Sequence, residues 1–431
     1  MANTEELKLY FDQKTGQVYT IIDGKQVRVA TTILEEEPKK KSSFISTTDV
    51  YPNSPDFLLG KENSPSLKIK AQDSDMYLAM GMRLQTAFES GTKQYENGDD
   101  ISYNDAYMRR VRLNMEAGFT EDITMVMDLR NDNANNDDNG EQQFRIGNAY
   151  INFSKPFDSP LVNFRLGRTK IDVSRTHMVS SGEQIHHDRV FVGDAAAQYI
   201  THNRRGPNGQ IFGDWEKKIH YQIAFGDGVH SGTTVDASGK KLSDIGEIES
   251  QNFFYGGKIK FSPFEGWEEQ KLTQTYFGQG KHFTAGVAYW KTGNIKTTDT
   301  VGTINNELTN IELSAHYNGL SMSAEYYHFD DVVKNWGSPD IGTSDGWYAT
   351  AEYVFTDYSF IAPFVRYESW DKYKESEAGE DYNFRSKLTG INWYIRGNRI
   401  KASLALQKDE YGKSLGDYTD TRYKFTTQWF F

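Results

Sequence analysis

The sequence predicts an all-β protein, a transmembrane antiparallel β-barrel of about sixteen strands with an N-terminal periplasmic segment. Three observations predict this fold. Apolar and polar residues alternate with a period of two through most of the chain beyond residue 75. The connections between the alternating stretches are short and long in turn, as in outer-membrane barrels. The chain also ends in the aromatic run "YKFTTQWFF", although its mean hydropathy is -0.69.

Composition excludes several other classes of protein. Aromatic residues make up 14% of the 431 residues, and 37 Gly stand against 10 Pro, which suits long strands joined by tight turns. The absence of cysteine excludes disulfides, thiolate metal sites and cysteine nucleophiles. The net charge of -12 disfavours nucleic acid as a partner. The apolar runs are too short for a transmembrane helix, which needs about 20 apolar residues.

The N-terminal part, residues 1–75, differs from the rest. Its beginning, "MANTEELKLYF", has neither the basic region nor the apolar region of a secretory signal, so we expect that the signal peptide is absent from this chain. The following stretch predicts two short strands with turns at Thr15-Gly16 and Asp23-Gly24. A charged linker and a proline-containing loop complete this part. We expect it to be periplasmic, where it could contact a periplasmic or envelope partner or another protomer.

Residues 76–431 are predicted to form the barrel. In "MYLAMGMRLQTAF", Met76, Leu78, Met80 and Met82 fall on one face and small or polar residues on the other, which does not fit helical spacing. Several such stretches are about 10 residues long, the length of a tilted membrane-spanning strand. The sixteen expected strands are 76–88, 106–118, 121–131, 143–154, 161–170, 203–214, 217–226, 251–262, 280–290, 307–317, 320–330, 346–355, 358–369, 383–396, 399–409 and 421–431.

The connections alternate in length along the whole barrel. Long polar connections are expected at 89–105, 132–142, 171–202, 227–250, 291–306, 331–345, 370–382 and 410–420, with shorter ones between them. A soluble propeller or a pair of β-sandwiches would also have many regular strands. That alternative does not explain the alternation in length, nor the aromatic residues at strand ends, such as Tyr289, Trp347, Trp370 and Trp429.

The last strand is expected to close the barrel. Phe425, Trp429 and Phe431 would face lipid, and the strand would pair with 76–88, because an open sheet edge is not tolerated in lipid. A terminal aromatic residue of this kind resembles the assembly signal of outer-membrane barrels. The chain end therefore indicates the outer membrane of a Gram-negative bacterium, with outer-membrane lipid as a partner.

The faces opposite the apolar ones would line a water-filled lumen. By strand parity they carry twelve basic residues: Arg83, Arg110, Arg112, Arg130, Arg165, Lys218, Lys258, Lys260, Arg366, Lys401, Arg422 and Lys424. Six acidic residues share these faces: Glu116, Asp128, Glu312, Glu325, Glu352 and Glu368. An excess of positive charge predicts a preference for anions, and arginine suits oxyanions. The alternative is that the arginines pair with lumen carboxylates, which would leave the pore weakly selective.

Part of the chain resembles a known family. The stretches "AYMRRVRLNMEAGFTEDITMVMDLR", "AYINFSKP", "LVNFRLGRTKI" and "RRGPNGQIFGDWEKKIHYQIAFGDG", between about residues 105 and 226, resemble the phosphate-selective porin O/P family. The resemblance extends over about residues 76–431. It implies a sixteen-stranded outer-membrane porin for passive diffusion of small hydrophilic solutes. It also implies a homotrimer, and a third long loop that folds into the pore.

The third long connection, 171–202, is also the longest, and it would form the constriction of the pore. Long loops without structure of their own are usually functional or disordered. The alternative is a loop that covers the surface of the barrel. The candidate pore-lining residues of this connection are Arg175, His177, Glu183, His186, His187, Asp188 and Arg189.

Neither a cofactor nor a metal site is expected. His186 and His187 stand beside Asp188, but adjacent residues rarely bind one ion together, and no further ligand spacing supports a site. The acidic run at 132–140 lacks the ligand spacing of an EF-hand. Two other functions stay open: a scaffold or binding protein of the cell envelope and, more remotely, an outer-membrane enzyme. No nucleophile–base pair is evident for the latter.

Overall fold

The structure, a computed structural model, divides into two compact units. They are Met1–Phe44 and Ile45–Phe431, so the larger unit begins before the predicted boundary at residue 75. Phe431, which was predicted to take part in barrel closure, lies outside the described residues. The described residues are 9–12, 17–22, 25–28, 45–47, 67–71, 74–134, 143–201, 204–229, 234–235, 241–243, 248–264, 272–297, 303–333, 341–372 and 383–430.

In the smaller unit, three short strands form an antiparallel sheet in the order β1-β2-β3. They are β1 (Leu9–Asp12), β2 (Gln17–Ile22) and β3 (Lys25–Arg28). The sequence predicts both turns of this sheet but one strand too few, because the residues before Thr15-Gly16 also pair with β2.

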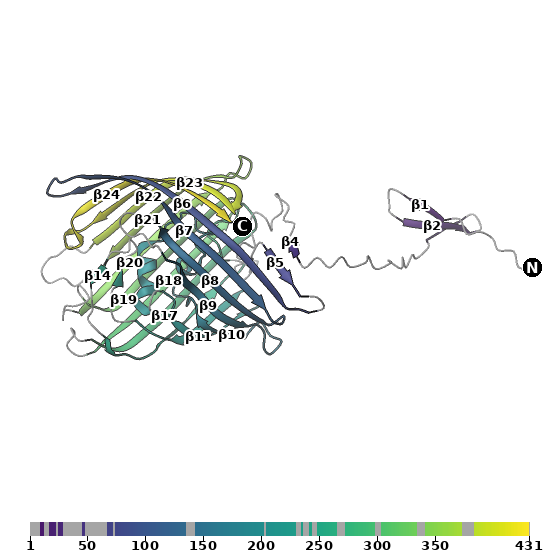
Figure 1. Cartoon of the computed structure of the whole chain (residues 1–431), viewed down its shortest axis with the longest axis horizontal. Coiled ribbons are helices and arrows are strands. Elements are labelled where there is room, and N and C mark those ends of the chain that lie inside the picture. Colours follow the sequence, from purple (N-terminus) through teal and green to yellow (C-terminus); the bar gives the residue numbers. More distant parts are fainter. Residues whose placement is uncertain are drawn as a thin grey trace, which may run out of the picture. The chain divides into compact units, whose positions relative to one another are not determined.

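Within the described part of the larger unit, sixteen antiparallel strands form a closed barrel, which confirms the predicted fold (Figure 1). Pairing between the last strand and the first closes the ring. The strands are β6 (Tyr77–Tyr95), β7 (Ile101–Gly118), β8 (Ile123–Ala134), β9 (Arg145–Phe153), β10 (Asn163–Arg168), β11 (Pro207–Trp215), β12 (Ile219–Gly226), β16 (Phe254–Phe261), β17 (Lys281–Thr297), β18 (Ile304–Tyr317), β19 (Leu320–Val333), β20 (Ile341–Tyr353), β21 (Ile361–Asp371), β22 (Asn383–Asn398), β23 (Ile400–Tyr411) and β24 (Tyr418–Phe430).

Smaller elements are attached to this ring. Strand β5 pairs with β6 at Tyr77–Met80, just beyond the point where Phe430 of β24 pairs with Arg83. The edge of β6 therefore continues past the closing seam. The smaller elements are β4 (Ile45–Thr47), β5 (Leu67–Lys70), β13 (Thr234–Val235), β14 (Lys241–Ser243), β15 (Ile248–Ser250) and the 3-10 helix η4 (Lys413–Leu415).

The two faces of the wall follow the predicted alternation. On β24, Phe425 and Trp429 are exposed on the outside, whereas Lys424 and Gln428 are buried inside. Phe425 pairs with Phe88 of β6 and Trp429 with Leu84, so both aromatic residues lie on the closing seam. Their proposed role in assembly stays a prediction.

Several strands are longer than the sequence predicts. Strand β6 continues to Tyr95 and β7 begins at Ile101, so the connection between them is 96–100 rather than 89–105. The outward residues near this end, such as Ser90 and Thr92, are polar. The apolar period disappears there while the strand pairing continues, so periodicity alone ends the strands too early.

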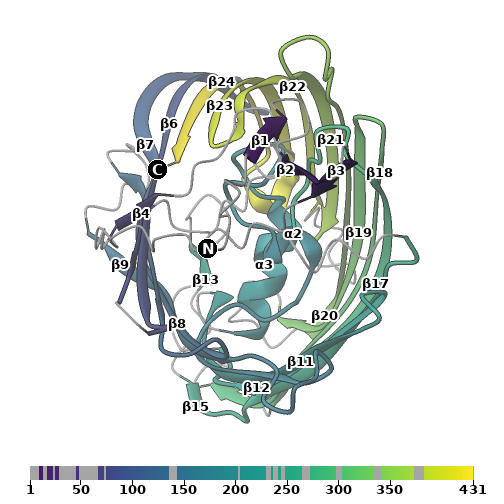
Figure 2. The ribbon, with the colours of Figure 1, turned by 90° about the vertical axis from the view of Figure 1, so that its right-hand side faces the viewer.

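The connection between β10 and β11 folds into the lumen, where Figure 2 shows its two helices inside the ring of strands. The helices are α2 (Arg175–Met178) and α3 (Phe191–Ile200). No helix within the described residues is long and apolar enough to cross a membrane.

An apolar core fills part of the lumen, where the sequence predicts mostly polar side chains. Phe191 of α3 packs on Trp370 and Phe384 of the inner wall, with ring centroids 5.5 and 4.5 Å apart. The prediction that Trp370 lies at the membrane interface is therefore wrong: it is 7% exposed and points inward. Its inward position is explained by the helix that covers it.

Candidate functional site

The segment between β10 and β11, residues 169–206, is called the lumen segment here. Most of its side chains are buried against the inner wall. Ser174 caps the first turn of α2, because its hydroxyl accepts a hydrogen bond from the backbone N–H of His177 at 3.2 Å. The predicted constriction loop thus has regular structure of its own and does not lie on the surface.

Wall carboxylates hold the beginnings of both helices. Glu312 and Glu325 accept the backbone N–H groups of Arg175 and Thr176 at 2.6 and 2.7 Å. Glu368 accepts the backbone N–H of Val192 at 2.6 Å. The first N–H groups of a helix have no partner within the helix and carry partial positive charge, so these carboxylates satisfy both needs.

Buried ion pairs fix two further points of the lumen segment. Lys258 of β16 contacts Asp172 at 3.0 Å and also contacts Glu312, and Lys260 contacts Asp172 at 3.1 Å. At the other point, Asp188 lies between Lys424 of β24, at 2.7 Å, and Arg109 of β7, at 2.8 Å.

The charge state of Asp188 follows from these contacts. Burial would raise the pKa of this carboxyl group, but the ammonium of Lys424 and the guanidinium of Arg109 outweigh burial and hold the pKa well below its usual range. Asp188 therefore stays charged and paired throughout the physiological pH range.

Polar wall side chains also donate to backbone carbonyls of the lumen segment. Arg110 donates to the carbonyl of His187 at 2.7 Å, and Arg366 to that of Asp188 at 2.9 Å. Lys401 donates to the carbonyl of Gln184 at 2.7 Å. These basic residues, expected from the sequence to line the pore, are covered by the segment that they hold.

The three predicted histidines are buried structural groups. The Nδ1 of His187 lies 2.6 Å from the hydroxyl of Thr426, and the ring of His186 lies 5.9 Å from that of Phe364. Burial lowers the pKa of His177, His186 and His187 well below the usual value, so all three stay neutral. Nearby cations lower these pKa values further, although the carboxylate of Asp188 opposes this at His186 and His187.

Arg175 links the lumen segment to the connection between β16 and β17. Its guanidinium donates to the carbonyl of Thr273 at 2.8 Å and to the hydroxyl of Tyr276 at 2.7 Å. Tyr276 in turn stacks on His316 of β18 with centroids 3.9 Å apart. Through these contacts the connection between β16 and β17 supports the lumen segment.

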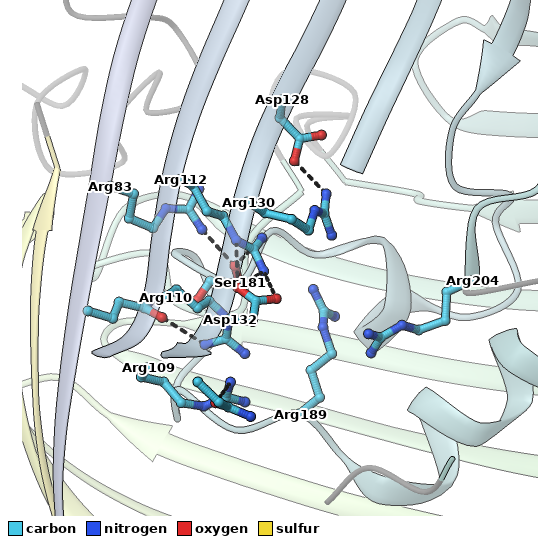
Figure 3. Close-up of polar contacts among 12 residues, drawn as sticks. Arg83, Arg109, Arg110, Arg112, Asp128, Arg130, Asp132, Ser181, Arg189 and Arg204 are labelled. Atoms are coloured by element: carbon cyan, nitrogen blue, oxygen red, sulfur yellow. Dashed lines mark hydrogen bonds and ion pairs between the residues drawn. The ribbon is translucent and has the colours of Figure 1, made fainter. Parts of the chain in front are cut away.

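The opposite side of the lumen segment faces β7 and β8 and is strongly basic (Figure 3). Arg112 contacts Asp132 at 2.8 Å and donates to the hydroxyl of Ser181 at 3.0 Å. Arg130 contacts Asp128 at 2.5 Å. These residues belong to a group called the basic cluster here: Lys170, Arg189, Arg204 and Arg205 from the lumen segment, with Arg109, Arg110, Arg112 and Arg130 from the wall.

The electrostatics of the basic cluster show that its charges are crowded. Burial, followed by Arg189 and Arg205, lowers the pKa of Lys170 well below its usual value. Burial also lowers the pKa of Arg189 to about 9, with Arg204 and Arg112 adding to the effect against the opposing carboxylate of Asp194. Cations that lower one another's pKa values would each be stabilised by an additional negative charge.

A β-bulge explains why strand parity misses Arg109. Gln85 pairs with Arg110 but Thr86 pairs with Met108, so one extra residue lies in β7. Arg109 and Arg110 then both reach the lumen segment, as a bulge can re-aim a side chain. The sequence analysis also missed Arg204 and Arg205 as site residues. Two adjacent arginines directly before the "GPNG" at the start of β11 are a signal that could have identified them.

The remaining predicted residues lie outside the basic cluster. Arg165 stacks between the rings of Tyr150 and Phe212, 4.8 Å from each. Lys218 is exposed in the turn before β12, which begins at Ile219 rather than at residue 217. Arg422 contacts Asp409 at 2.6 Å and Asp420 at 2.8 Å.

Comparison with known proteins assigns the fold to a family. The family model described as phosphate-selective porin O and P matches residues 79–422. The chain belongs to this porin family. The porin is 25% identical over 371 residues to an uncharacterized protein of Aquifex aeolicus (strain VF5), covering 80% of this chain and 85% of that one. Family and fold place it among the channel-forming barrels of the outer membrane.

Solved structures share the fold of the porin at low sequence identity. An anion-selective porin from Comamonas acidovorans has a TM-score of 0.53 at 12% identity, covering 83% of this chain and 100% of that one. The outer membrane channel DcaP of Acinetobacter baumannii has a TM-score of 0.55 at 11% identity, covering 84% and 99%. OmpF of Salmonella typhi, in complex with daunomycin, has a TM-score of 0.54 at 12% identity, covering 82% and 98%.

Proposed function

We propose that this porin passes small hydrophilic solutes by passive diffusion and prefers anions of the phosphate type. The path of the solutes runs past the half-buried members of the basic cluster, such as Arg189 and Arg204. No chemical step is involved. The protein supplies an electrostatic field along the path and a limit on solute size.

The observation that carries this proposal is the charge balance of the basic cluster. Its eight basic side chains meet four carboxylates, those of Asp128, Asp132, Asp188 and Asp194. A site with low-dielectric walls and charge of one sign concentrates ions of the opposite sign. Guanidinium groups also match the geometry of oxyanions such as phosphate.

The alternative that lumen arginines pair with carboxylates applies to only half of the basic cluster. Each carboxylate engages one arginine: Arg130, Arg112, Arg109 and Arg204 in turn. The other four cations donate to neutral oxygens. Arg110 donates to the side-chain oxygen of Gln85 at 2.7 Å, Arg189 to the carbonyl of Val179 at 3.0 Å, Arg205 to Asn148 at 3.0 Å, and Lys170 to the carbonyl of Met178 at 3.3 Å.

The reversal potential of the porin in planar lipid bilayers tests this function. With KCl at different concentrations on the two sides, we expect a sign that reports chloride as the more permeant ion. Added phosphate is expected to reduce chloride current, because both ions would occupy the same basic cluster. A reversal potential of the opposite sign would overturn the anion preference and leave the channel function standing.

Two assembly expectations remain proposals. The family resemblance implies a homotrimer, and native mass spectrometry of the detergent-solubilised porin would show three copies. Residues 1–75 are proposed to be periplasmic and to contact an envelope partner or another protomer. A chain without residues 1–44 should keep its conductance if this segment serves assembly or partner binding only.

A further inference from the structure

Four charged residues form a cluster on the outer surface of β22 and β23. Arg385 and Lys387 of β22 and Lys408 of β23 are exposed, and Glu410 of β23 is half-buried. They alternate with inward residues such as Ser386, which is 2% exposed, so all four side chains point away from the lumen. These four residues are called the rim cluster.

The rim cluster lies where the apolar outer band ends. Lys387 pairs with Tyr367 of β21, and one pleat further along β22 the outward residues become Thr389 and Ile391. The ring of Tyr367 lies 5.2 Å from that of Trp347, as in the aromatic girdle at a membrane interface. Beyond the cluster come the long connections 372–382 and 412–417, and long connections face the cell exterior in such barrels.

Charge within the rim cluster is unbalanced. Lys387 and Lys408 are direct cross-strand partners, and like charges in that arrangement destabilise a sheet. Glu410 pairs with Arg385 across the strands and contacts Lys408 at 2.8 Å, so within the rim cluster one carboxylate faces three cations. Asp371 of β21, which pairs with Asn383 of β22, lies one pleat further along and leaves the excess positive. A bound anion would remove this repulsion.

Two other groups of charged residues on the outer rim are balanced or acidic. Lys291 of β17 contacts Glu307 of β18 at 2.6 Å as a matched pair. His328 of β19 contacts Asp345 of β20 at 2.7 Å and Asp330 at 3.3 Å. These two groups, unlike the rim cluster, have no excess of positive charge.

We propose that the rim cluster binds a phosphate group of the phosphorylated glycolipid headgroups in the outer leaflet. Arg385 supplies a planar guanidinium that can hold two phosphate oxygens, and Lys387 and Lys408 supply ammonium groups beside it. The acyl chains would lie along the apolar band below, against residues such as Ile391 and Leu404. The site is on the outside of the barrel and does not depend on what passes through the pore.

Native mass spectrometry of the detergent-purified porin with bisphosphorylated lipid A tests the proposal. Each basic residue near a phosphate contributes about 1 kcal/mol, which corresponds to about a fivefold change in affinity. The double variant Arg385→Gln/Lys387→Gln should therefore bind this lipid roughly 25-fold more weakly than the unaltered porin. The matched control is Lys291→Gln, at the same level of the rim, which should bind as the unaltered porin does.

Two further arms identify the ligand chemistry. Dephosphorylated lipid A should bind the unaltered porin and the double variant equally weakly. Millimolar inorganic phosphate should not displace the lipid, because acyl chains contribute to its binding. Equal binding of bisphosphorylated lipid A to the double variant and the unaltered porin would overturn the proposal, as would full displacement by inorganic phosphate or loss of binding in Lys291→Gln alone. Unchanged heat-dependent gel mobility would show that each variant is folded.

Discussion

The two sides of the lumen segment differ in how their charged groups are paired. Toward β16–β24, wall carboxylates meet helix N–H groups, and Lys258 and Lys424 meet Asp172 and Asp188. Toward β7 and β8, basic groups outnumber carboxylates, and half of them donate to neutral oxygens. The matched charges on the first side hold the segment in position, whereas the excess of basic groups on the second side leaves an electric field that acts on a solute. The same segment thus combines support and selectivity.

Breaking the matched side should have the largest effect. Lys258→Met removes a cation that is 4% exposed and leaves Asp172 and Glu312 buried together without it. Losing one partner of a buried ion pair typically costs about 3–5 kcal/mol. We expect a correspondingly lower free energy of unfolding in urea, with noisier single-channel currents because the lumen segment is released.

Two companion variants sharpen this test. Lys260→Met removes a neighbouring contact to Asp172 from a side chain that is 12% exposed, and it should cost less. The triple variant Lys258→Met/Asp172→Asn/Glu312→Gln should regain most of the stability, because it leaves no uncompensated charge. If Lys258→Met unfolded at the same urea concentration as the unaltered porin, the ion pairs would not be what holds the segment.

Acid should loosen the lumen segment to a smaller extent. His177, His186 and His187 have pKa values held below the unfolded value of about 6.5, so unfolding takes up protons as the pH falls past that value. Their contribution to stability is complete above pH 7 and is lost progressively below pH 6.5. Unfolding midpoints measured between pH 8 and 5 should therefore decrease.

A variant without two of these imidazoles separates their effect from that of the carboxylates. His186→Gln/His187→Gln should flatten the decrease between pH 7 and 5, even if its stability at pH 8 is lower than that of the unaltered porin. Asp188 should contribute nothing to the slope in this range, because its pKa lies far below it. A decrease of the same steepness in the variant would assign the pH dependence to other groups.

The barrel was predictable from the sequence because it depends on a local pattern. Alternation identifies the sixteen strands and the closing pair of β24 and β6, because outward side chains face an apolar environment and inward side chains face the lumen. Strand ends were less predictable, because residues such as Ser90 continue the pairing without continuing the apolar pattern.

The site was predictable only in part, because it depends on contacts between distant segments. Strand parity correctly predicted that Arg112 and Arg130 point inward. It could not show that the lumen segment covers Arg110 and Arg366. It missed Arg109 because a bulge shifts the register by one residue. A bulge has no dependable signature in a single sequence.

Substitutions in the basic cluster should have the smallest effect on free energy, and this effect should be confined to ion selectivity. A unit charge about 7 Å from the ion path contributes about 0.6 kcal/mol in water, which changes the permeability of each ion roughly threefold. The effects on an anion and a cation are opposite, so Arg189→Gln should lower the ratio of chloride to potassium permeability roughly sevenfold, while Asp132→Asn should raise it. The two variants should thus change the permeability ratio in opposite directions. An electrostatic effect predicts this, whereas a change in pore width does not.

Arg165→Gln serves as the matched control for this pair. Arg165 is also a half-buried lumen arginine, but it stacks between Tyr150 and Phe212 outside the basic cluster. The same loss of one charge should then change the permeability ratio less than Arg189→Gln does. If all three variants moved the ratio in one direction, the net charge of the lumen, or its width, would govern selectivity, and the contrast between the two sides of the lumen segment would have no role in it.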